Sequence, residues 1–446
     1  MQRILLVAYH FPPSDAIGAR RAGRFARLLP QFGYEVDVLC SELPLRGEEP
    51  HDDPKGVGFA DPTQTPDLPP GTVVHRSRTP FLWGRYPDSA PPAGSRTRTA
   101  SWYAKTYADW YLATRDWDWR WGHAALEAQL RRGGLKAYDA IVVDAPPNGY
   151  VAEFILAAYE AGVPSILDLR DLWLPKKSVK LPGLLHPALR RRRWDRDQCI
   201  HAVARSSHVV LTSEVAADEM RSAFSVLSPD HFSVVYNAFE ADDVEPDDAP
   251  AAPFDGTLRI TYTGSLAYGR DKMVVRLIEA MAANQKQGGP PVRLTLVGSE
   301  QGDLPSLAAR LGVADQIDFH GWATRDEAVA IQQASHVLLL LQTNEPFGAK
   351  VAIPGKLFEY MARRRPILSM ATKASNQIVA DYELGEVVDA DDVESIAASL
   401  PRLAKLAATG QLLPRPPEDF SDVSTTRELA ARLDAILDPS AATSPA

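Results

Sequence analysis

The chain has few cysteines and no long apolar run, the features that mark disulfide-rich and membrane-spanning proteins. Its 446 residues include only two cysteines, Cys40 and Cys199. They allow neither a disulfide framework nor a cysteine-based metal site, so a reducing cytosol is the simplest setting. No stretch approaches the roughly 20 apolar residues that span a bilayer. The first apolar run, residues 3–9, is too short for a signal peptide and lacks a small-residue cleavage site. We therefore expect a cytoplasmic protein that does not cross a membrane.

Positive charge is not in excess either. The chain has 48 Lys and Arg against 57 Asp and Glu, a formal net charge of −9. Nucleic-acid-binding domains are usually basic, so we expect no nucleic-acid partner. No G-x-G-x-x-G sequence follows the first strand of either half of the chain, which excludes the dinucleotide-binding fingerprint.

Alternating strands and helices fill two halves of the sequence. Strand-length apolar runs occur at residues 3–9, 36–40, 139–144, 165–169, 209–212 and 232–236, and again at 258–262, 293–297, 317–320 and 336–341. Segments with helical spacing separate them, for example residues 20–32 and 273–283. This alternation predicts an α/β fold of two Rossmann-like, doubly wound parallel-sheet domains. Two such domains that face each other leave a cleft at the carboxyl ends of their strands, where ligands bind.

Composition sets the expected domain boundaries. Residues 41–100 are rich in Pro, Gly, Asp and Arg and are predicted to form an irregular insertion. Residues 241–256 are acidic and Pro-rich, as a linker is. We therefore expect, in order, an N-terminal domain over 1–240, a linker over 241–256, a C-terminal domain over 257–420, a final helix over 421–438 and a disordered tail over 439–446.

The segment from residue 336 to residue 362 is the most informative stretch. A buried strand over 336–341 is followed by a loop and by a helix with Pro354 in its first turn. Gly355 and Lys356 then place backbone N–H groups and a cation at the positive end of that helix, which makes an anion site. Glu359, one turn later, can accept hydrogen bonds from sugar hydroxyls. The alternative is an ordinary αβ unit whose Lys and Glu are solvated.

A second loop, Gly264 to Lys272, spaces its glycines as a P-loop does. Arg270 and Asp271 stand where that motif needs Lys and Ser or Thr, so this is not a nucleotidase loop. Arg270 and Lys272 precede a helix, and two cations there can neutralise a diphosphate leaving group without a metal. A tight turn with exposed charges is the alternative.

These motifs together resemble GT-B glycosyltransferases of the family-four type, over about residues 1–440. The resemblance rests on the order and spacing of the segments 9–18, 168–173, 235–237, 263–271, 320–322 and 354–362. It implies a GT-B fold and transfer of a hexosyl group, with retention and without a metal or other cofactor. The implied donor is a nucleotide-diphosphate sugar, and the implied acceptor is a glycan or lipid-linked sugar in polysaccharide or glycoconjugate synthesis.

The resemblance also implies roles for single residues. Glu359 corresponds to the second glutamate of an E-x7-E motif and binds the donor ribose. The donor phosphates meet the backbone at Gly355 and Lys356 and, in the loop after the strand, at Gly264. The remaining implied contacts are Arg270 and Lys272 with the diphosphate, Gly321 and Trp322 with the base, Gly18 with the donor from the first domain, and Arg170 and Asp171 near the transferred sugar.

Two positions depart from the family's pattern. Val351 stands where the first glutamate of E-x7-E is expected, and Glu345 could replace it only if the loop folds back. Arg170 stands where many members have a histidine. Because arginine stays protonated, its role is electrostatic or structural, and Asp171 could simply pair with it.

The acceptor side has a candidate membrane surface. Aromatic residues crowd into one stretch, with Lys105, Arg115 and Arg120 among them: Trp102, Tyr103, Tyr107, Trp110, Tyr111, Trp117, Trp119 and Trp121. A basic run, residues 190–193, lies in the same domain. Aromatic rings beside cations suit peripheral contact with the inner face of a membrane. A helix packed on the domain core, with solvated arginines, is the alternative.

Two other functions compete with glycosyl transfer. A sugar-nucleotide epimerase on the same fold needs an acid/base set, which His10, Asp168 and Asp171 do not make. A non-catalytic GT-B scaffold is the third option, because the first glutamate is absent.

Overall fold

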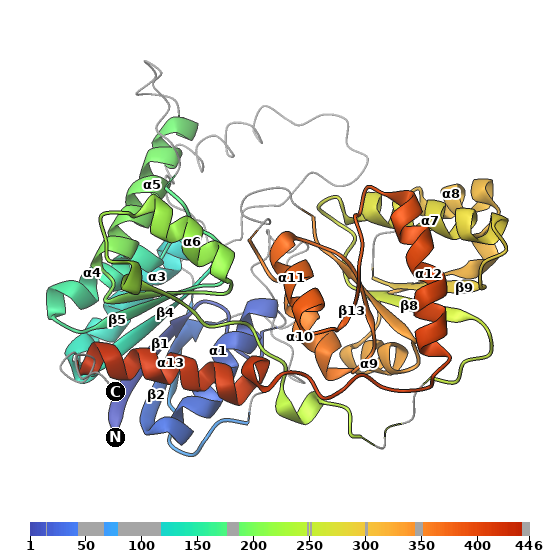
Figure 1. Ribbon diagram of the computed structural model, residues 1–446. Coiled ribbons are helices and arrows are strands. Elements are labelled where there is room, and N and C mark those ends of the chain that lie inside the picture. Colours follow the sequence, from blue (N-terminus) through green and yellow to red (C-terminus); the bar gives the residue numbers. More distant parts are fainter. Residues whose placement is uncertain are drawn as a thin grey trace. The chain divides into compact units, whose positions relative to one another are not determined.

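The computed structural model describes residues 1–14, 16–42, 67–78, 117–175, 187–247, 249, 252–298, 302–343 and 351–438. The chain forms two compact units, which Figure 1 shows coloured along the sequence. The first unit is Met1–Val235 with Thr426–Ala446, and the second is Tyr236–Thr425. The chain therefore passes between the units twice, after Val235 and within its last helix. The boundaries predicted near residues 240 and 420 lie a few residues from these points.

The described part of the first unit contains a parallel sheet of seven strands in the order β3-β2-β1-β4-β5-β6-β7. The strands are β1 Gln2–Ala8, β2 Tyr34–Ser41, β3 Val74–Ser77, β4 Ala140–Ala145, β5 Ser165–Leu169, β6 His208–Leu211 and β7 Phe232–Val234. The order reverses between β1 and β4, where Ile4 pairs with Ala140. Residues 4–8 of β1 are buried, as expected for a parallel strand covered on both faces.

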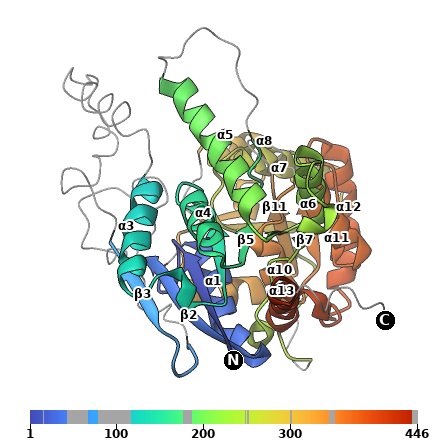
Figure 2. The same cartoon turned by 90° about the vertical axis from the view of Figure 1, so that its left-hand side faces the viewer.

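Helices connect these strands. They are α1 Ile17–Leu28, α3 Trp117–Arg131, α4 Val151–Ala161, α5 Pro187–Arg205 and α6 Glu214–Ala223, with short 3-10 turns η1 Leu29–Phe32, η3 Leu135–Ala137 and η4 Pro229–His231. Helices α3, α4 and α5 lie next to one another (Figure 2). Gly33 ends the first helical segment with a φ of +92°, which a residue without a Cβ adopts freely.

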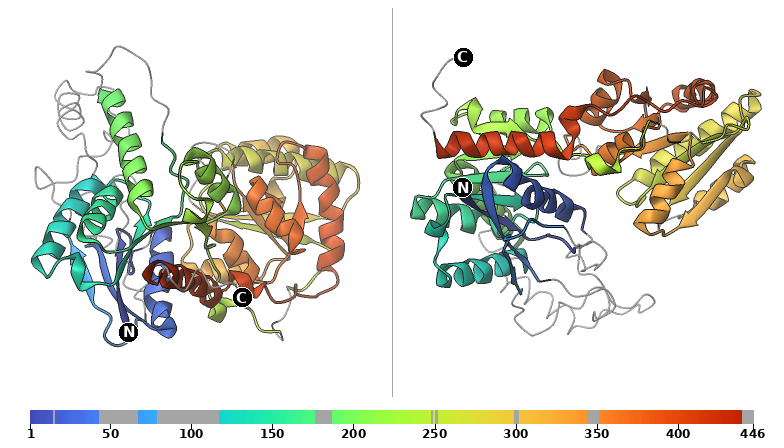
Figure 3. Two further views of the ribbon diagram at one scale, coloured as in Figure 1. Left: turned by 60° about the vertical axis from the view of Figure 1, so that its left-hand side comes forward. Right: turned by 90° about the horizontal axis from the view of Figure 1, so that it is seen from below.

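The last helix, α13 Asp422–Leu437, contributes to the core of the first unit. Its residues Leu429, Ala430 and Leu433 are buried in the same cluster as the apolar side chains of β1 and β2. The Tyr34 hydroxyl of β2 donates to the carbonyl of Ala430, with the two oxygens 3.4 Å apart. Figure 3 shows α13, in red, running alongside this unit. The predicted final helix is thus part of a domain core.

The described part of the second unit contains a six-stranded parallel sheet in the order β10-β9-β8-β11-β12-β13. The strands are β8 Leu258–Thr263, β9 Val292–Val297, β10 Ile317–Gly321, β11 Val337–Leu341, β12 Ile367–Met370 and β13 Gly385–Val387. The helices are α7 Arg270–Lys286, α8 Leu304–Leu311, α9 Arg325–Gln333, α10 Gly355–Ala362, α11 Lys373–Asp381 and α12 Val393–Ala407, with turns η5 Ala241–Asp243, η6 Ala314–Gln316 and η7 Glu418–Phe420.

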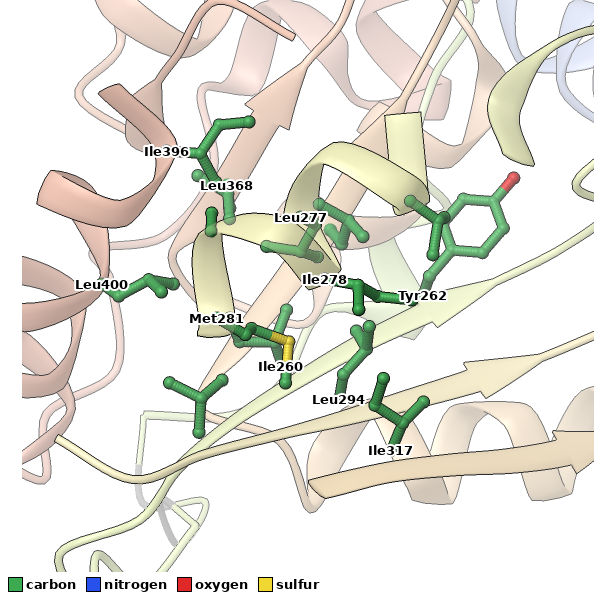
Figure 4. Packing of buried hydrophobic residues seen from close by; sticks show 14 of the residues in the cluster. Ile260, Tyr262, Leu277, Ile278, Met281, Leu294, Ile317, Leu368, Ile396 and Leu400 are labelled. Atoms are coloured by element: carbon green, nitrogen blue, oxygen red, sulfur yellow. The ribbon is translucent and has the colours of Figure 1, made fainter. Parts of the chain in front are cut away.

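The core of the second unit lies between its sheet and two long helices. Leu277, Ile278 and Met281 of α7 point toward the strands, as Figure 4 shows. Ile396 and Leu400 of α12 close the same cluster and are fully buried. Helix α7 therefore has a fixed place on the sheet, and its first residues have a fixed place at the sheet's carboxyl edge.

The predicted doubly wound architecture is confirmed in both units. Two details differ from the expectation. β3 lies inside the segment 41–100 that was predicted to be irregular. It is a short, half-exposed edge strand with His75 and Arg76, so it lacks the apolar pattern of a buried strand. Pro354 is not in the first turn of α10 but just before it, with extended backbone (φ −67°, ψ 141°). No helix of the described residues is long and apolar enough to cross a membrane.

Three consecutive arginines hold the first part of the predicted linker to the second unit. Arg365 and Glu245 form a buried ion pair at 2.9 Å. Arg364 donates to the carbonyl of Glu245, and Arg363 donates to the carbonyl of Asp243. Residues 243–245 are therefore fixed beside the end of α10 rather than free.

His208, at the start of β6, is a buried titratable group of the first unit. Its Nε2 lies 2.7 Å from the Ser233 hydroxyl. Burial lowers the pKa of His208 to about 4, and the nearby charges of Arg432 and His231 lower it further. The unfolded chain therefore binds a proton at this residue between about pH 6.5 and pH 4, whereas the folded chain does not.

We predict that, because of His208, the protein becomes less stable as the pH is lowered from about 6.5 to about 4. The contribution of His208 to the free energy of unfolding is complete above pH 6.5 and is lost toward pH 4. The loss amounts to about 2 kcal/mol between pH 7 and pH 5. Replacing His208→Gln should reduce the drop in the denaturation midpoint between these two pH values. His201→Gln, at an exposed position of α5, is the control and should leave the drop unchanged. An equal drop in all three proteins would contradict the prediction.

Candidate functional site

Three glycines form a row at the carboxyl edge of the second sheet. Gly264 follows β8, Gly298 follows β9, and Gly321 ends β10. The Gly264 N–H donates to the carbonyl of Val297 at 2.7 Å, and the Gly298 N–H donates to the carbonyl of Gly321 at 2.7 Å. All three have positive φ, and a Cβ on Gly298 would overlap the carbonyl oxygen of Gly264. Only glycine fits this close approach, and the edge exposes backbone rather than side chains.

The end of the Lys356 side chain lies against the backbone of Gly264. A Cβ built on Gly264 would come within 2.5 Å of the Lys356 Cε and 2.6 Å of its Nζ. Gly355 and Lys356 are the first two residues of α10, so their N–H groups lie at the positive end of the helix dipole. The ammonium, these N–H groups and the positive end of the helix dipole therefore converge beside the Gly264 backbone. The order of strands reverses here, between β8 and β11, and doubly wound sheets bind ligands at such a point.

The two predicted diphosphate cations leave α7 in different directions. Arg270 and Lys272 are the first and third residues of this helix, and side chains two apart do not share a helix face. The Arg270 guanidinium donates to the carbonyl of Ser265 at 3.4 Å and is half-buried, whereas Lys272 is exposed. The cations found against the Gly264–Ser265 backbone are thus Arg270 and Lys356.

A buried hydrogen-bond network holds Glu359. The Gln332 amide donates from Nε2 to Glu359 Oε1 at 3.0 Å and to the Thr263 hydroxyl at 2.9 Å. The Tyr360 hydroxyl lies 3.2 Å from the same Thr263 oxygen. Gln332, Thr263 and Tyr360 were not identified from the sequence. Gln332 is polar but buried, whereas the other residues of α9 are half-buried or exposed.

Two exposed aromatic rings follow strands of this sheet. Trp322, predicted beside the base, comes directly after β10 and is 69% exposed. Tyr268 was not predicted; it lies in the loop after β8, is 74% exposed and has a φ of +61°. The Thr343 hydroxyl donates to the Tyr268 carbonyl at 3.1 Å, which holds this unusual conformation.

In the first unit, the structure brings Gly18 and Arg170 together. A Cβ on Gly18 would overlap the Arg170 guanidinium. The Arg170 Nε donates to Asp144 Oδ1 at 2.9 Å, and its Nη2 donates to the carbonyl of Pro146. Asp171 is exposed, so Arg170 has its ion pair with Asp144 and not, as one option had it, with Asp171.

A second buried ion pair lies beside the first. Arg21 of α1 binds Asp168 through two parallel hydrogen bonds of 2.7 and 2.8 Å. Asp168 of β5 is the register partner of Asp144 of β4. Burial raises the pKa of Asp144, the neighbouring Asp168 charge raises it further, and Arg170 opposes both. The two aspartates and two arginines form a compact ionic cluster at the carboxyl ends of adjacent strands.

Several predicted positions lie outside the described residues. These are Glu345 and the aromatic residues from Trp102 to Tyr111, together with the side chains of residues 190–192. Val351 is buried, 4% exposed. Trp121 is also fully buried, with its ring edge-on to Tyr9 and Tyr150, which supports core packing for that residue. The part of the chain that the structure describes contains no group of three or more His, Cys, Asp or Glu side chains suited to a metal ion.

Part of the second unit is similar in sequence to known proteins. Residues 257–405 match the family described as "Glycosyl transferases group 1". The chain is 30% identical over 129 residues to the lipopolysaccharide core biosynthesis glycosyltransferase LpsE of Rhizobium meliloti, covering 28% of this chain and 34% of LpsE. It is 27% identical over 177 residues to D-inositol 3-phosphate glycosyltransferase of Stackebrandtia nassauensis, covering 36% and 37%. These matches span about a third of the length of each relative.

Solved structures share the whole architecture. HepE of Anabaena, in complex with UDP and glucose, superposes with a TM-score of 0.57 at 14% identity, over 98% of this chain and 100% of HepE. WaaG, a glycosyltransferase involved in lipopolysaccharide biosynthesis, gives a TM-score of 0.53 at 16% identity, over 98% of both chains. At such identities the likeness concerns the fold alone, and it confirms the predicted GT-B fold.

We predict that Asp144, and not Asp171, supports Arg170. Removing one partner of a buried ion pair leaves the other charge unpaired, so Asp144→Ala should lower the stability of the first unit by about 3 kcal/mol. Asp171→Ala, on the surface, should change stability by less than about 0.5 kcal/mol. Chemical denaturation measures both. Adding Arg170→Met to Asp144→Ala should recover part of the loss; no recovery would mean that the unpaired charge is not the cause.

Proposed function

We propose that the protein is a glycosyltransferase that moves a hexosyl group from a nucleotide-diphosphate sugar to an acceptor hydroxyl. The observation that carries this proposal is the convergence of the Lys356 ammonium, the start of α10 and the bare Gly264 backbone, one helical turn from Glu359. This is an anion cradle with a carboxylate beside it. The residues lie within the range that matches the glycosyl transferases group 1 family.

The cradle suits a diphosphate leaving group. As the bond between the sugar C1 and the β-phosphate oxygen breaks, the electron pair stays with the diphosphate. The N–H groups of Gly355 and Lys356, the Lys356 ammonium and the Arg270 guanidinium would stabilise that developing charge, which is commonly the largest single catalytic effect. Because these cations can carry the charge, we propose that transfer needs no metal ion. The attacking hydroxyl forms the new bond to C1 and loses its proton to the departing phosphate oxygen, with retention.

The remaining proposed contacts with the donor involve residues near the carboxyl edge of the second sheet. Glu359 would accept hydrogen bonds from the ribose hydroxyls. The base would lie against the backbone at Gly321, beside the exposed ring of Trp322. The HepE structure is a complex with UDP and glucose, so uridine diphosphate is the first nucleotide to test.

The first unit supplies the acceptor side in this proposal. Gly18, Arg170 and Asp171 lie at the carboxyl edge of its sheet. Because Asp144 pairs with Arg170, the guanidinium has a fixed position and its charge is largely neutralised, which suits an orienting role. LpsE acts in lipopolysaccharide core biosynthesis, so we propose a cell-surface glycan or lipid-linked sugar as acceptor. Work on such an acceptor would place the protein in the cytoplasm, in peripheral contact with the inner face of the membrane.

Calorimetric titration with UDP-, GDP- and ADP-sugars tests this function directly. Binding accompanied by slow hydrolysis of the donor supports a transferase. Interconversion of the sugar without hydrolysis would instead identify an epimerase, and binding of none of the donors would identify a scaffold.

We predict that the double variant Arg270→Ala, Lys272→Ala loses donor turnover by at least about 100-fold, because the leaving diphosphate loses its stabilising cations. The two single variants show which cation carries the effect, and the contact with Ser265 favours Arg270. The control is the double variant Arg276→Ala, Lys286→Ala, which removes the same charge from exposed positions of α7. Unchanged turnover in the Arg270, Lys272 variant would remove both residues from the site.

We also predict that Gly264→Ala weakens nucleotide-diphosphate binding by about tenfold or more, because a methyl group would displace the Lys356 ammonium from the cradle. Gly312→Ala is the matched control. Gly312 also has a positive φ, +72°, but a Cβ there meets nothing within 4 Å, so only backbone strain is added. Calorimetry should find normal affinity in Gly312→Ala. Equal losses in the two variants would point to strain alone.

A further inference from the structure

Gln332 occupies an unusual position for a glutamine. All nine residues of α9 are described, and among them Gln332 alone is buried, with no exposed surface. A buried side-chain amide lowers stability unless its polar atoms find partners. The Gln332 Nε2 finds them in Thr263 at the end of β8 and in Glu359 on α10, whereas its Oε1 is buried without a hydrogen-bond partner among the described residues.

The chemistry of the contact fixes which way the amide points. A carboxylate only accepts hydrogen bonds, so the amide must turn its NH₂ group, and not its oxygen, toward Glu359. The amide makes both of these contacts through Nε2, at 3.0 Å to Glu359 Oε1 and 2.9 Å to Thr263 Oγ1. Each of the two N–H groups therefore has its own oxygen. A rotation of the Glu359 carboxylate that takes Oε1 away from the Gln332 Nε2 would leave a buried donor without a partner.

A second connection holds the same network from α10. Tyr360, next to Glu359, is fully buried. Its hydroxyl lies 3.3 Å from the Thr263 nitrogen and 3.2 Å from the Thr263 hydroxyl. Thr263 thus joins the residue that orients the carboxylate to the helix that carries it. The carboxylate is held through its own Oε1 and through the backbone of its helix.

We propose that Gln332 is a positioning residue that orients Glu359 for recognition of the donor ribose, and that it sets the preference for ribose over 2′-deoxyribose. This inference rests on the proposed function. A carboxylate has about four lone-pair sites, so one hydrogen bond from Gln332 leaves acceptor capacity for ligand hydroxyls. Glu359 is the single acidic residue of α10, and its orientation determines whether a ribose hydroxyl meets an acceptor. Gln332 touches no ligand itself and acts through Glu359.

The test compares a nucleoside diphosphate with its 2′-deoxy counterpart. The probe is whichever of UDP, GDP and ADP binds the unmodified protein most tightly, and calorimetry gives both dissociation constants. We expect the unmodified protein to prefer the ribonucleotide by about tenfold or more, as befits a hydrogen bond to a charged acceptor. Gln332→Met keeps the length of the side chain but has no amide. It should reduce the preference to within about threefold while the 2′-deoxy form binds as before.

Matched variants separate positioning from general damage. Gln333→Met changes the adjacent, exposed glutamine and should leave the preference unchanged. Glu359→Gln should lose the preference, and Gln332→Met added to it should have no further effect on the ratio. If Gln332→Met does not fold, Thr263→Val decides, because it removes the other partner of the amide while keeping the side-chain shape. It should lower the preference as well.

Four outcomes would overturn the inference. The first is a full ribose preference in Gln332→Met, and the second is an equal loss of affinity for both nucleotides, which marks a merely structural residue. The third is an unchanged preference in Thr263→Val where Gln332→Met does not fold. All three leave the proposed function standing. The fourth, an unmodified protein that binds none of the three nucleotides, removes the proposed function and this inference together.

Discussion

The close approach of backbones at the carboxyl edge of the second sheet is the constraint on which the candidate site depends. Gly264, Gly298 and Gly321 stand where neighbouring strands end; the Gly264 N–H donates to the carbonyl of Val297, and the Gly298 N–H donates to the carbonyl of Gly321. A Cβ on Gly298 would overlap the Gly264 carbonyl oxygen, and a Cβ on Gly264 would push Lys356 away. Without side chains in this row, the start of α10 and its lysine can lie directly on the end of β8. The positive charge lies at this point because the glycine backbone leaves room for the Lys356 side chain.

At the corresponding edge of the first sheet, the positive charges are paired with buried carboxylates. Here too a glycine, Gly18, lets a cation approach the backbone, but Arg170 is paired with Asp144, and Arg21 beside it is paired with Asp168. Buried ion pairs contribute little net stability, and their loss on one side is costly. Such a cluster fixes geometry while it cancels charge. The start of α10 thus brings positive charge to the edge of the second sheet, whereas at the edge of the first sheet each of these buried arginines is balanced by an aspartate.

Sequence patterns predicted the parts of the fold that depend on local order. Largely apolar runs marked β1, β4, β5 and β11, because parallel strands covered on both faces carry no polar alternation. Edge strand β3 was missed because it is half-exposed and polar. In the site, Lys356 and Glu359 were predicted because they share one helix. Gln332, Thr263 and Asp144 were not, since their partners come from other elements. No local pattern records that Arg170 turns to Asp144, which lies on another strand, rather than to the adjacent Asp171.

Buried apolar side chains hold the residues directly before α10. Val351 and Ile353 are both buried. The Thr372 hydroxyl donates to the carbonyl of Ala352 and fixes the loop further. With its entry held in this way, α10 keeps Lys356 and Glu359 one turn apart at a constant orientation to the Gly264 backbone. The position of the Glu359 carboxylate therefore follows from the held start of α10 and from the Gln332 amide that donates to it.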